Sequence, residues 1–251
     1  MDYYQLPPDD FLKDFIRCYW WLDNSTDQDL KFSILPDGCF DLIILFKNYK
    51  QDHISLSGLW SKKTEVTVPP NTQLFGIQFR LLAVDYIFQE KIASMLNQQK
   101  NLKDDYWALD SFSLFDNDRA ELVKQLDGKI YSCINSKKEI DARKQKLFKL
   151  LYQTKGNEPT DFYAQQVFWS RRQITRYFQN RFGLSLKAYC NILKCSASFK
   201  HLKKGQLYPE QNYFDQSHFI KSLKKHTGNT PKDLFENKND RFLQLTIIPK
   251  K

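Results

Sequence analysis

The sequence lacks the features that would mark a membrane-spanning or secreted protein. Its 251 residues contain no run of about 18 apolar residues, so no membrane span is expected. The opening stretch MDYYQLPPDDF carries acidic side chains where a secretory signal needs basic ones. The five cysteines are odd in number and form no C-x-x-C pair. We therefore expect reduced thiols and a cytoplasmic location.

Signatures of catalysis are missing as well. Only His53 lies in the first 200 residues, so the histidine cluster of a metal-dependent enzyme is absent, and we interpret His53 as a surface strand residue. No Gly-rich phosphate loop and no G-x-S-x-G motif occurs. Cys39 has no basic neighbour in sequence that would activate its thiol. The sequence thus predicts no catalytic residue, no metal and no cofactor.

Two aspartates in this region have simple structural interpretations. Asp37 stands in Pro-Asp-Gly and is most simply a turn former. Asp41 lies near the start of an apolar run. We interpret it as a hydrogen-bonded structural carboxylate, with an acidic pocket residue as the alternative.

Charge is divided unequally along the chain, whose net charge is +9. Residues 1–141 hold 16 Lys and Arg against 22 Asp and Glu, a net charge of −6. Residues 142–251 hold 22 against 7, a net charge of +15. This division predicts that the C-terminal part binds a polyanion, with a merely solubilising basic surface as the alternative.

The first 80 residues have the pattern of short strands separated by turns. The apolar run FDLIILF at 40–46 is too short for a typical helix and follows a Pro-Asp-Gly turn, which favours a buried strand. The predicted strands are 19–22, 31–35, 40–46, 53–57, 65–68 and 74–80. Such a series predicts a compact β-barrel or sandwich. From about residue 81 the apolar period becomes helical as far as Leu96, and further helices are predicted at 118–134 and 138–153.

A Gly-, Asn- and Pro-containing linker at 154–159 precedes a series of predicted helices. A short helix at 160–167 is followed by one that begins after Ser170, where Gln173 completes a capping box, and that ends at Gly183. Ser185 then caps a long helix to about residue 204. A brief helix at 207–212, a helix at 215–226 and a last helix that begins at Thr230-Pro231 complete the chain.

The helix after Ser170 has two faces, and its pattern returns 45 residues later. Apolar residues and the stem of Arg181 occupy one face, and hydrogen-bonding residues suited to base edges and phosphates occupy the other. The corresponding positions, in order, are Ser170 and Asp215, Ile174 and Phe219, Arg176 and Lys221, Phe178 and Leu223, Gly183 and Gly228, and Ser185 and Thr230. We interpret the repeat as the duplication of one helix-turn-helix unit.

These residues carry a resemblance to a known family. The first set is Ala164, Ser170, Ile174, Arg176, Phe178, Gly183 and Ser185, and the second is Tyr213, Asp215, Phe219, Leu223, Gly228, Thr230 and Pro231. With these two motifs, the C-terminal hundred residues resemble the DNA-binding domain of AraC/XylS-family bacterial transcription regulators. The N-terminal part, with ILPDGCFDLI from Ile34 and LFGIQF from Leu74, resembles a cupin-like domain of undefined function.

The resemblance implies an α+β fold with three parts. These are a β-rich sensor or oligomerisation domain with linking helices at 1–153, a DNA-binding domain of two helix-turn-helix units joined by a long helix at 154–240, and a tail at 241–251. This chain departs from the family at the first helix-turn-helix turn, where Phe168 replaces a small residue. Because Phe tolerates positive φ poorly, this turn must have another geometry or carry strain.

The resemblance also implies the residues that contact DNA. In the first unit they are Arg171, Arg172, Thr175, Arg176 and Gln179, and in the second Gln216, Ser217, His218, Ile220, Lys221 and Lys224. Arg176 is the candidate for a guanine, Gln216 for an adenine and Ile220 for a thymine methyl, whereas Arg171, His218 and Lys224 would contact the backbone. The alternative for both helices is an ordinary solvated face.

We therefore predict a sequence-specific transcription regulator that binds double-stranded DNA and acts as an activator. RNA polymerase, a small-molecule effector and a second copy of the chain are its further expected partners. One alternative is a cupin-like small-molecule-binding protein or enzyme whose helical domain is degenerate and binds DNA or protein non-specifically. Because Tyr208-Pro209 interrupts its first helix, the second unit could contact mainly backbone.

Overall fold

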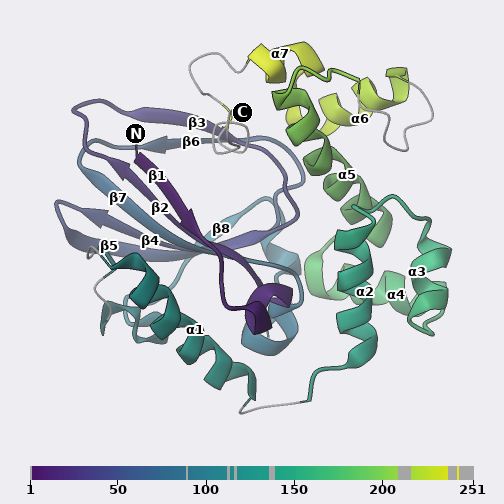
Figure 1. Ribbon diagram of the computed structural model, residues 1–251, viewed down its shortest axis with the longest axis horizontal. Coiled ribbons are helices and arrows are strands. Elements are labelled where there is room, and N and C mark those ends of the chain that lie inside the picture. The colour runs from purple at the N-terminus through teal and green to yellow at the C-terminus, as the bar shows by residue number, and fades with distance from the viewer. Residues whose placement is uncertain are drawn as a thin grey trace.

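The computed structural model describes residues 2–88, 90–111, 114–115, 118–135, 139–208, 216–236 and 242. A β domain comes first and a group of helices follows it (Figure 1). The strands are β1 (Asp2–Leu6), β2 (Ile16–Asn24), β3 (Leu30–Ile34), β4 (Phe40–Lys47), β5 (Lys50–Ser57), β6 (Thr64–Val68), β7 (Thr72–Phe79) and β8 (Gln99–Asn101). The predicted α+β class, with an N-terminal β domain before the helical region, is confirmed.

Short helices and longer ones follow the strands or lie between them. The short ones are η1 (Asp10–Asp14), η2 (Val84–Phe88), η3 (Ala93–Met95) and η4 (Tyr106–Ser111). The longer ones are α1 (Arg119–Asn135), α2 (Ala142–Gln153), α3 (Thr160–Gln166), α4 (Arg171–Phe182), α5 (Leu186–Lys203), α6 (Gln216–Thr227) and α7 (Pro231–Glu236). In Figure 1 the sheet lies on one side, α1 beneath it, and α5 extends from the first helical unit toward α6 and α7.

The main sheet is antiparallel and has six strands in the order β1-β2-β7-β4-β5-β8. Strands β3 and β6 pair separately as a two-stranded ribbon. Side chains alternate between the faces of the sheet, as a strand period of two requires. In β4, for example, Phe40, Leu42 and Ile44 are fully buried in the main core, while Asp41 and Ile43 point to the opposite face, where a cavity lies.

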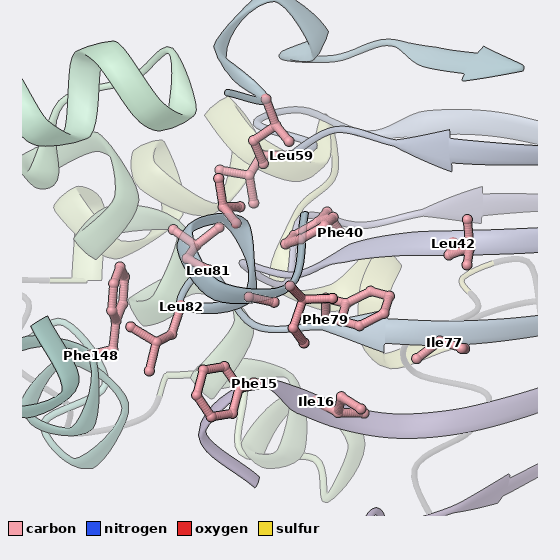
Figure 2. Packing of buried hydrophobic residues seen from close by; sticks show 14 of the residues in the cluster. Phe15, Ile16, Phe40, Leu42, Leu59, Ile77, Phe79, Leu81, Leu82 and Phe148 are labelled. Atoms are coloured by element: carbon pink, nitrogen blue, oxygen red, sulfur yellow. The ribbon is translucent and has the colours of Figure 1, made fainter. Parts of the chain in front are cut away.

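One apolar core joins the β domain to the first helical unit. Phe40, Phe79 and Leu82 of the β domain belong to the same cluster as Phe148 of α2 (Figure 2). Phe178 of α4 belongs to this cluster too. A second cluster contains Leu35, Cys195, Phe199, Leu202, Phe219, Leu223, Leu234 and Phe242, from the end of β3, α5, α6, α7 and beyond. The apolar core is therefore continuous across residue 153, where the sequence predicts a domain boundary.

The predicted helix from residue 81 to Leu96 is wrong. Among the described residues of this stretch, the helical elements are only the π-turn η2 and the 3-10 turn η3. Between them the backbone N–H of Ile92 donates to the carbonyl oxygen of Arg181 in α4, at 3.0 Å. An N–H directed to another helix cannot continue its own helix, so this contact overrides the local apolar period. The strands β1 and β8 were not predicted, and α2 begins at Ala142 rather than at residue 138.

The helix boundaries that depend on caps agree with the sequence. Ser170 and Gln173 form both hydrogen bonds of the capping box, and Gly183 ends α4 in the left-handed conformation, with φ of 79°. Ser185 caps α5 and accepts from the backbone N–H of Ala188. The helix predicted at 207–212 falls mostly on residues 209–215, which lie outside the described part of the chain, as does the predicted tail except for Phe242.

Candidate nucleic-acid interface and ligand cavity

Helices α3 and α4 form a helix-turn-helix unit whose turn carries an unusual residue. Phe168 has φ of 54°, and its side chain is 86% exposed. Its backbone N–H donates to Gln165, and that of Trp169 donates to Ala164, which is the hydrogen-bond pattern of a Schellman turn. The residue at this place is usually Gly, so the turn has ordinary geometry with a strained residue. The sequence left two possibilities for this turn, a different geometry or a strained residue. The positive φ of Phe168 shows that the residue is strained.

Helix α4 buries one face and exposes the other. Ile174, Phe178 and Phe182 are fully buried in the main core. The predicted DNA-contacting residues Arg172, Thr175, Arg176 and Gln179 are all exposed. Within the described part of the chain, their side chains form no hydrogen bond or ion pair. The face is therefore open to a partner and rich in hydrogen-bonding groups.

Arg171 differs from its neighbours because its charge is already paired. Its Nε and Nη2 atoms donate to the two carboxylate oxygens of Asp161 in α3. This bidentate pair ties the beginning of α4 to the first helix of the unit. Arg171 remains a candidate for phosphate contact, but only if phosphate competes with Asp161.

The far end of α4 is attached to the β domain through a buried carboxylate. Asp85 of η2 is only 6% exposed at its side chain, and it pairs with Arg181 at 2.5 Å and with Lys144 of α2 at 2.7 Å. The hydroxyl of Tyr177 donates to the same carboxylate at 2.7 Å. Burial and the charge of Asp85 raise the pKa of Tyr177, so the hydroxyl remains a donor. The β domain thus fixes the position of α4.

Helix α6 repeats the arrangement in the second unit. Phe219 and Leu223 are buried in the second core cluster, whereas Gln216, Ser217, His218, Lys221 and Lys224 are exposed. Ile220, the predicted contact for a thymine methyl, is half-buried and packs against that cluster. Most of the predicted contact face is therefore available, and Ile220 also serves packing.

The end of α6 is also attached to the β domain. The backbone N–H of Lys63 donates to the carbonyl of His226 at 2.8 Å, and Nδ1 of His226 donates to the carbonyl of Ser61 at 2.8 Å. Burial lowers the pKa of His226, which favours the neutral ring with its proton on Nδ1. The two helices are thus held by two loops of the β domain, at Ser61–Lys63 and at Ile92.

Hydrogen bonds join these two loops into one segment. The N–H of Gly58 donates to the carbonyl of Gln98, and that of Asn97 donates to the carbonyl of Leu59, each at 2.8 Å. The side chain of Asn97 accepts from the N–H of Ser61, also at 2.8 Å. A displacement of either loop would therefore alter the hydrogen bonds that hold both α4 and α6.

A cavity of about 570 Å³ lies between the main sheet, the β3–β6 ribbon and α5. Its volume falls in the range of small-molecule sites, roughly 300–1,000 Å³. Most of its lining is apolar or aromatic, including Trp20, Phe32, Ile43, Trp60 and Phe199. Ser196, Phe199 and Lys200 of α5 form part of the wall, so one side of the cavity belongs to the helix that joins the two helix-turn-helix units.

Several polar residues of the cavity lie in one row across the end of the sheet. The strand register pairs Cys18 with Gln78, Gln78 with Asp41, and Ser57 with Gln99, and the backbone N–H of Asp41 donates to the hydroxyl of Ser57. The next row contains Trp20 and Ile43 with Gln5 and Ser55, and the row after it contains Leu22, Leu74 and Leu45 with His53. Polar groups are thus most concentrated at one end of the cavity, and apolar side chains become more frequent beyond it.

Asp41 is the carboxyl group at the centre of this row. Its Oδ1 accepts from the indole N–H of Trp20 at 2.9 Å. Burial, with a contribution from the charge of Asp37, raises the pKa of Asp41 to about 7, although hydrogen bonds from Trp20 and Gln78 and the charge of Arg17 oppose the shift. From the sequence, a hydrogen-bonded structural carboxylate and an acidic pocket residue were alternative interpretations of Asp41. In the structure Asp41 has both features, because it accepts a hydrogen bond from Trp20 and lines the cavity.

Asp37 links the cavity to α5. Its carboxylate accepts from Arg17 at 3.0 Å, from Gln78 at 3.2 Å and from the N–H of Cys39 at 3.0 Å. The next residue, Gly38, has φ of 82°, and its carbonyl accepts from the hydroxyl of Tyr189 in α5 at 2.9 Å. Asp37 is thus a turn former, as predicted, and also part of the joint between the two halves of the molecule.

Gly76 of β7 makes the cavity possible at its centre. A Cβ added there would lie 2.0 Å from the indole of Trp20, which a side chain cannot do. Because Gly76 has none, the indole lies across the sheet and reaches Asp41. None of Trp20, Arg17 and Gln78 was singled out from the sequence as a site residue. Strand alternation does place Trp20 on the same face of β2 as Cys18, and Gln78 on the same face of β7 as Gly76, whereas Arg17 stands where the register of β2 shifts.

In the described part of the chain, no group of three or more His, Cys, Asp or Glu side chains is placed to hold a metal ion. No helix in that part of the chain is long and apolar enough to cross a lipid bilayer.

Comparison with known proteins gives one family match. Residues 4–101 match the model of a domain of unknown function, DUF6597, which covers less than half of the chain. No curated protein matches the chain in sequence.

Several solved structures are similar in outline over almost the whole chain. ToxT from Vibrio cholerae O395 is 13% identical, with a TM-score of 0.42, over 95% of this chain and 97% of that one. The same protein bound to (E)-4-(8-methylnaphthalen-1-yl)but-3-enoic acid is 14% identical, with a TM-score of 0.42, over 93% and 97%. Wild-type ToxT of Vibrio cholerae strain SCE256 bound to an unsaturated fatty acid is 12% identical, with a TM-score of 0.41, over 94% of each chain.

Proposed function

We propose that this protein is a sequence-specific transcription regulator of the AraC/XylS type. In this proposal α4 and α6 enter the major groove of duplex DNA, the cavity of the β domain holds a small effector, and the chain performs no catalytic step. The observation that carries the proposal is the exposed face of α4, with Arg172, Thr175, Arg176 and Gln179 on a helix that is capped at its start and held by Asp85 near its end.

The chemistry of this face suits base edges. A guanidinium group has two parallel N–H donors that match O6 and N7 of guanine, and Gln and Thr add hydrogen bonds and a methyl contact. Arg176 is exposed and forms no ion pair in the described part of the chain, so its donors are available. The anchoring of α4 fixes its angle to the rest of the unit, and a fixed angle is needed for readout of particular bases.

The spacing of the two units also supports the proposal. Helix α5 has 18 residues, which at about 1.5 Å per residue gives a length of about 27 Å. One turn of DNA is about 34 Å, so helices at the two ends of α5 are suitably separated for successive major grooves. The net charge of +15 on residues 142–251 adds attraction to phosphate.

The position of the cavity suggests how an effector would act. Ser196 and Phe199 of α5 line it, and Asp37 at its polar end adjoins the Gly38–Tyr189 hydrogen bond. A ligand there would contact both the β domain and the helix that spaces the two DNA-contacting helices. Such a ligand can favour one arrangement of the units only by binding that arrangement more tightly.

Substitution of Arg176 tests the proposal. Arg176→Ala should weaken binding to the preferred duplex by about 1–3 kcal/mol and relax the requirement at one base position, with a smaller effect on random duplex. Lys124→Ala serves as the control, because Lys124 is an exposed cation of α1, which lies beneath the sheet at the lower left of Figure 1, well apart from α4 at the right. Equal losses on preferred and random duplex would contradict readout by Arg176.

A further inference from the structure

We infer that the cavity binds an amphipathic organic cation, with an amine nitrogen at Asp41 and an apolar body along Trp20 and Ile43. The inference deepens the proposed function, since it names the chemical class of the effector, but it can be tested without DNA. It depends on the geometry of the polar row, on the pairing of the charges and on the aromatic rings.

The order of the rows sets the orientation of the ligand. Asp41, Gln78 and Ser57 form the polar end, beside α5. The rows farther along the sheet carry Ile43 and Leu45 beside Ser55 and His53, and the ribbon opposite contributes Phe32, Ile34, Val66 and Val68. A molecule with one polar end and an apolar body satisfies both regions, whereas a wholly polar molecule would leave its hydrogen-bonding groups against apolar side chains.

The pairing of charges decides the sign of the ligand. Arg17 and Asp37 pair with each other at 3.0 Å, so their charges largely compensate. Asp41 has no ion-pair partner within the described part of the chain. Lys200 is likewise unpaired there, but it is exposed, and a solvated ammonium needs no partner. A carboxylate that burial shields from water does need one, so the unmet requirement of the cavity is for a positive charge at Asp41.

Two aromatic rings, those of Trp20 and Tyr3, lie near this carboxyl group, and a third lines the same cavity. Trp20 donates to Asp41, and Tyr3 stacks on Trp20 with ring centroids 6.4 Å apart. Trp60 also lines the cavity. Ring faces attract a cation, and more strongly where water is excluded. The carboxylate and the rings therefore favour the same ligand charge.

A matched series of probes tests the inference on the full chain by calorimetric titration. The probes are 4-phenylbutylamine, 4-phenylbutanol and 4-phenylbutanoate, which share an apolar body and differ in the polar end. The amine should bind about tenfold or more tightly than the alcohol and the carboxylate, as expected for a hydrogen bond to a charged group. Tightest binding of the carboxylate would mean that Arg17 and Lys200 determine the ligand, and it would overturn the inference, as would equal binding or no binding of the three.

Two variants assign the effect to Asp41. Asp41→Asn keeps an oxygen for the Trp20 indole but removes the charge, so it should reduce amine affinity about tenfold and leave the alcohol unchanged. Asp10→Asn, on an exposed aspartate of η1, should change neither. Unchanged amine affinity in Asp41→Asn would contradict the assignment. If Asp41→Asn does not fold, the ranking of the probes on the natural chain still decides.

The outcome is separable from that of the proposed function. Amine binding without DNA binding would keep this inference and remove the regulator proposal. DNA binding by a chain that prefers the carboxylate would do the reverse.

Discussion

The guanidinium of Arg181 lies 2.5 Å from the carboxylate of Asp85, and this pair joins α4 to the β domain. Asp85 also accepts from Tyr177 and pairs with Lys144, so one buried carboxylate holds two side chains of α4 and one of α2. The β domain therefore positions α4 directly, rather than only through the chain connection.

Removal of the Asp85 charge should destabilise the protein. Asp85→Asn leaves Arg181 and Lys144 partly buried without their counter-charge, and breaking such a pair costs about 3 kcal/mol. Urea-induced unfolding measures the change in the free energy of unfolding. Asp10→Asn, which breaks the exposed pair with Lys13, is the control and should leave the unfolding midpoint unchanged. A similar midpoint for both variants would mean that Asp85 does not hold the two parts together.

Replacement of the strained turn residue should have the opposite effect. Phe168→Gly keeps the left-handed conformation but removes its steric cost, which is about 1–2 kcal/mol for a non-glycine residue, and little burial is lost because the ring is exposed. The free energy of unfolding should rise by about 0.5–1 kcal/mol after the greater flexibility of the unfolded glycine is counted. Phe168→Ala retains a Cβ and should not gain this stability, so equal stabilities of the two variants would argue against strain.

Lys224 should contribute to DNA binding in a different way from Arg176. As an exposed cation of α6, Lys224 would neutralise a phosphate, so Lys224→Ala should weaken preferred and random duplexes alike. The slope of log affinity against log salt should become shallower by about one. Titrations at several salt concentrations measure it. A loss confined to one sequence would instead assign base readout to Lys224.

The raised pKa of Asp41 predicts a pH-dependent effect on stability. Its pKa is about 7 in the folded chain against 3.8 for an ordinary aspartate, so between these values the unfolded chain is ionised while the folded chain holds the proton. This group therefore lowers stability as pH rises from about 4 to about 7. Its surroundings include the charged or titratable groups of Asp37, Arg17, Cys18 and Tyr3.

Asp41→Asn removes this titration. Relative to the natural chain, the variant should gain stability at pH 8 compared with pH 5, by an amount on the order of 2 kcal/mol. Urea-induced unfolding of both chains at the two pH values gives the difference, in which the other titrating groups largely cancel. The same relative stability at pH 5 and pH 8 would mean that Asp41 ionises normally in the cavity.

Local chemistry made the helix-turn-helix units predictable. The start of α4 depends on a hydrogen-bonded exchange between Ser170 and Gln173, and its end depends on a positive φ at Gly183, both within a few residues. The exposed faces of α4 and α6 follow from their helical period. These features are specified by neighbouring residues, so the sequence alone was sufficient.

Long-range contacts made other features unpredictable. The segment around Ile92 has a helical apolar period, but its N–H bonds to Arg181, some ninety residues later. The cavity exists only because the β3–β6 ribbon and α5 close over the sheet, and no local pattern shows that closure. Asp41 is near Trp20 through the strand order β2-β7-β4, which the sequence does not contain.

Selection of bound sequences from a random duplex library, at about 150 mM salt, tests the central claim most directly. The account predicts enrichment of two short motifs about one helical turn apart, one for α4 and one for α6. Salt-sensitive binding with no enriched sequence would contradict it, because the exposed faces of these helices would then grip phosphate without reading bases.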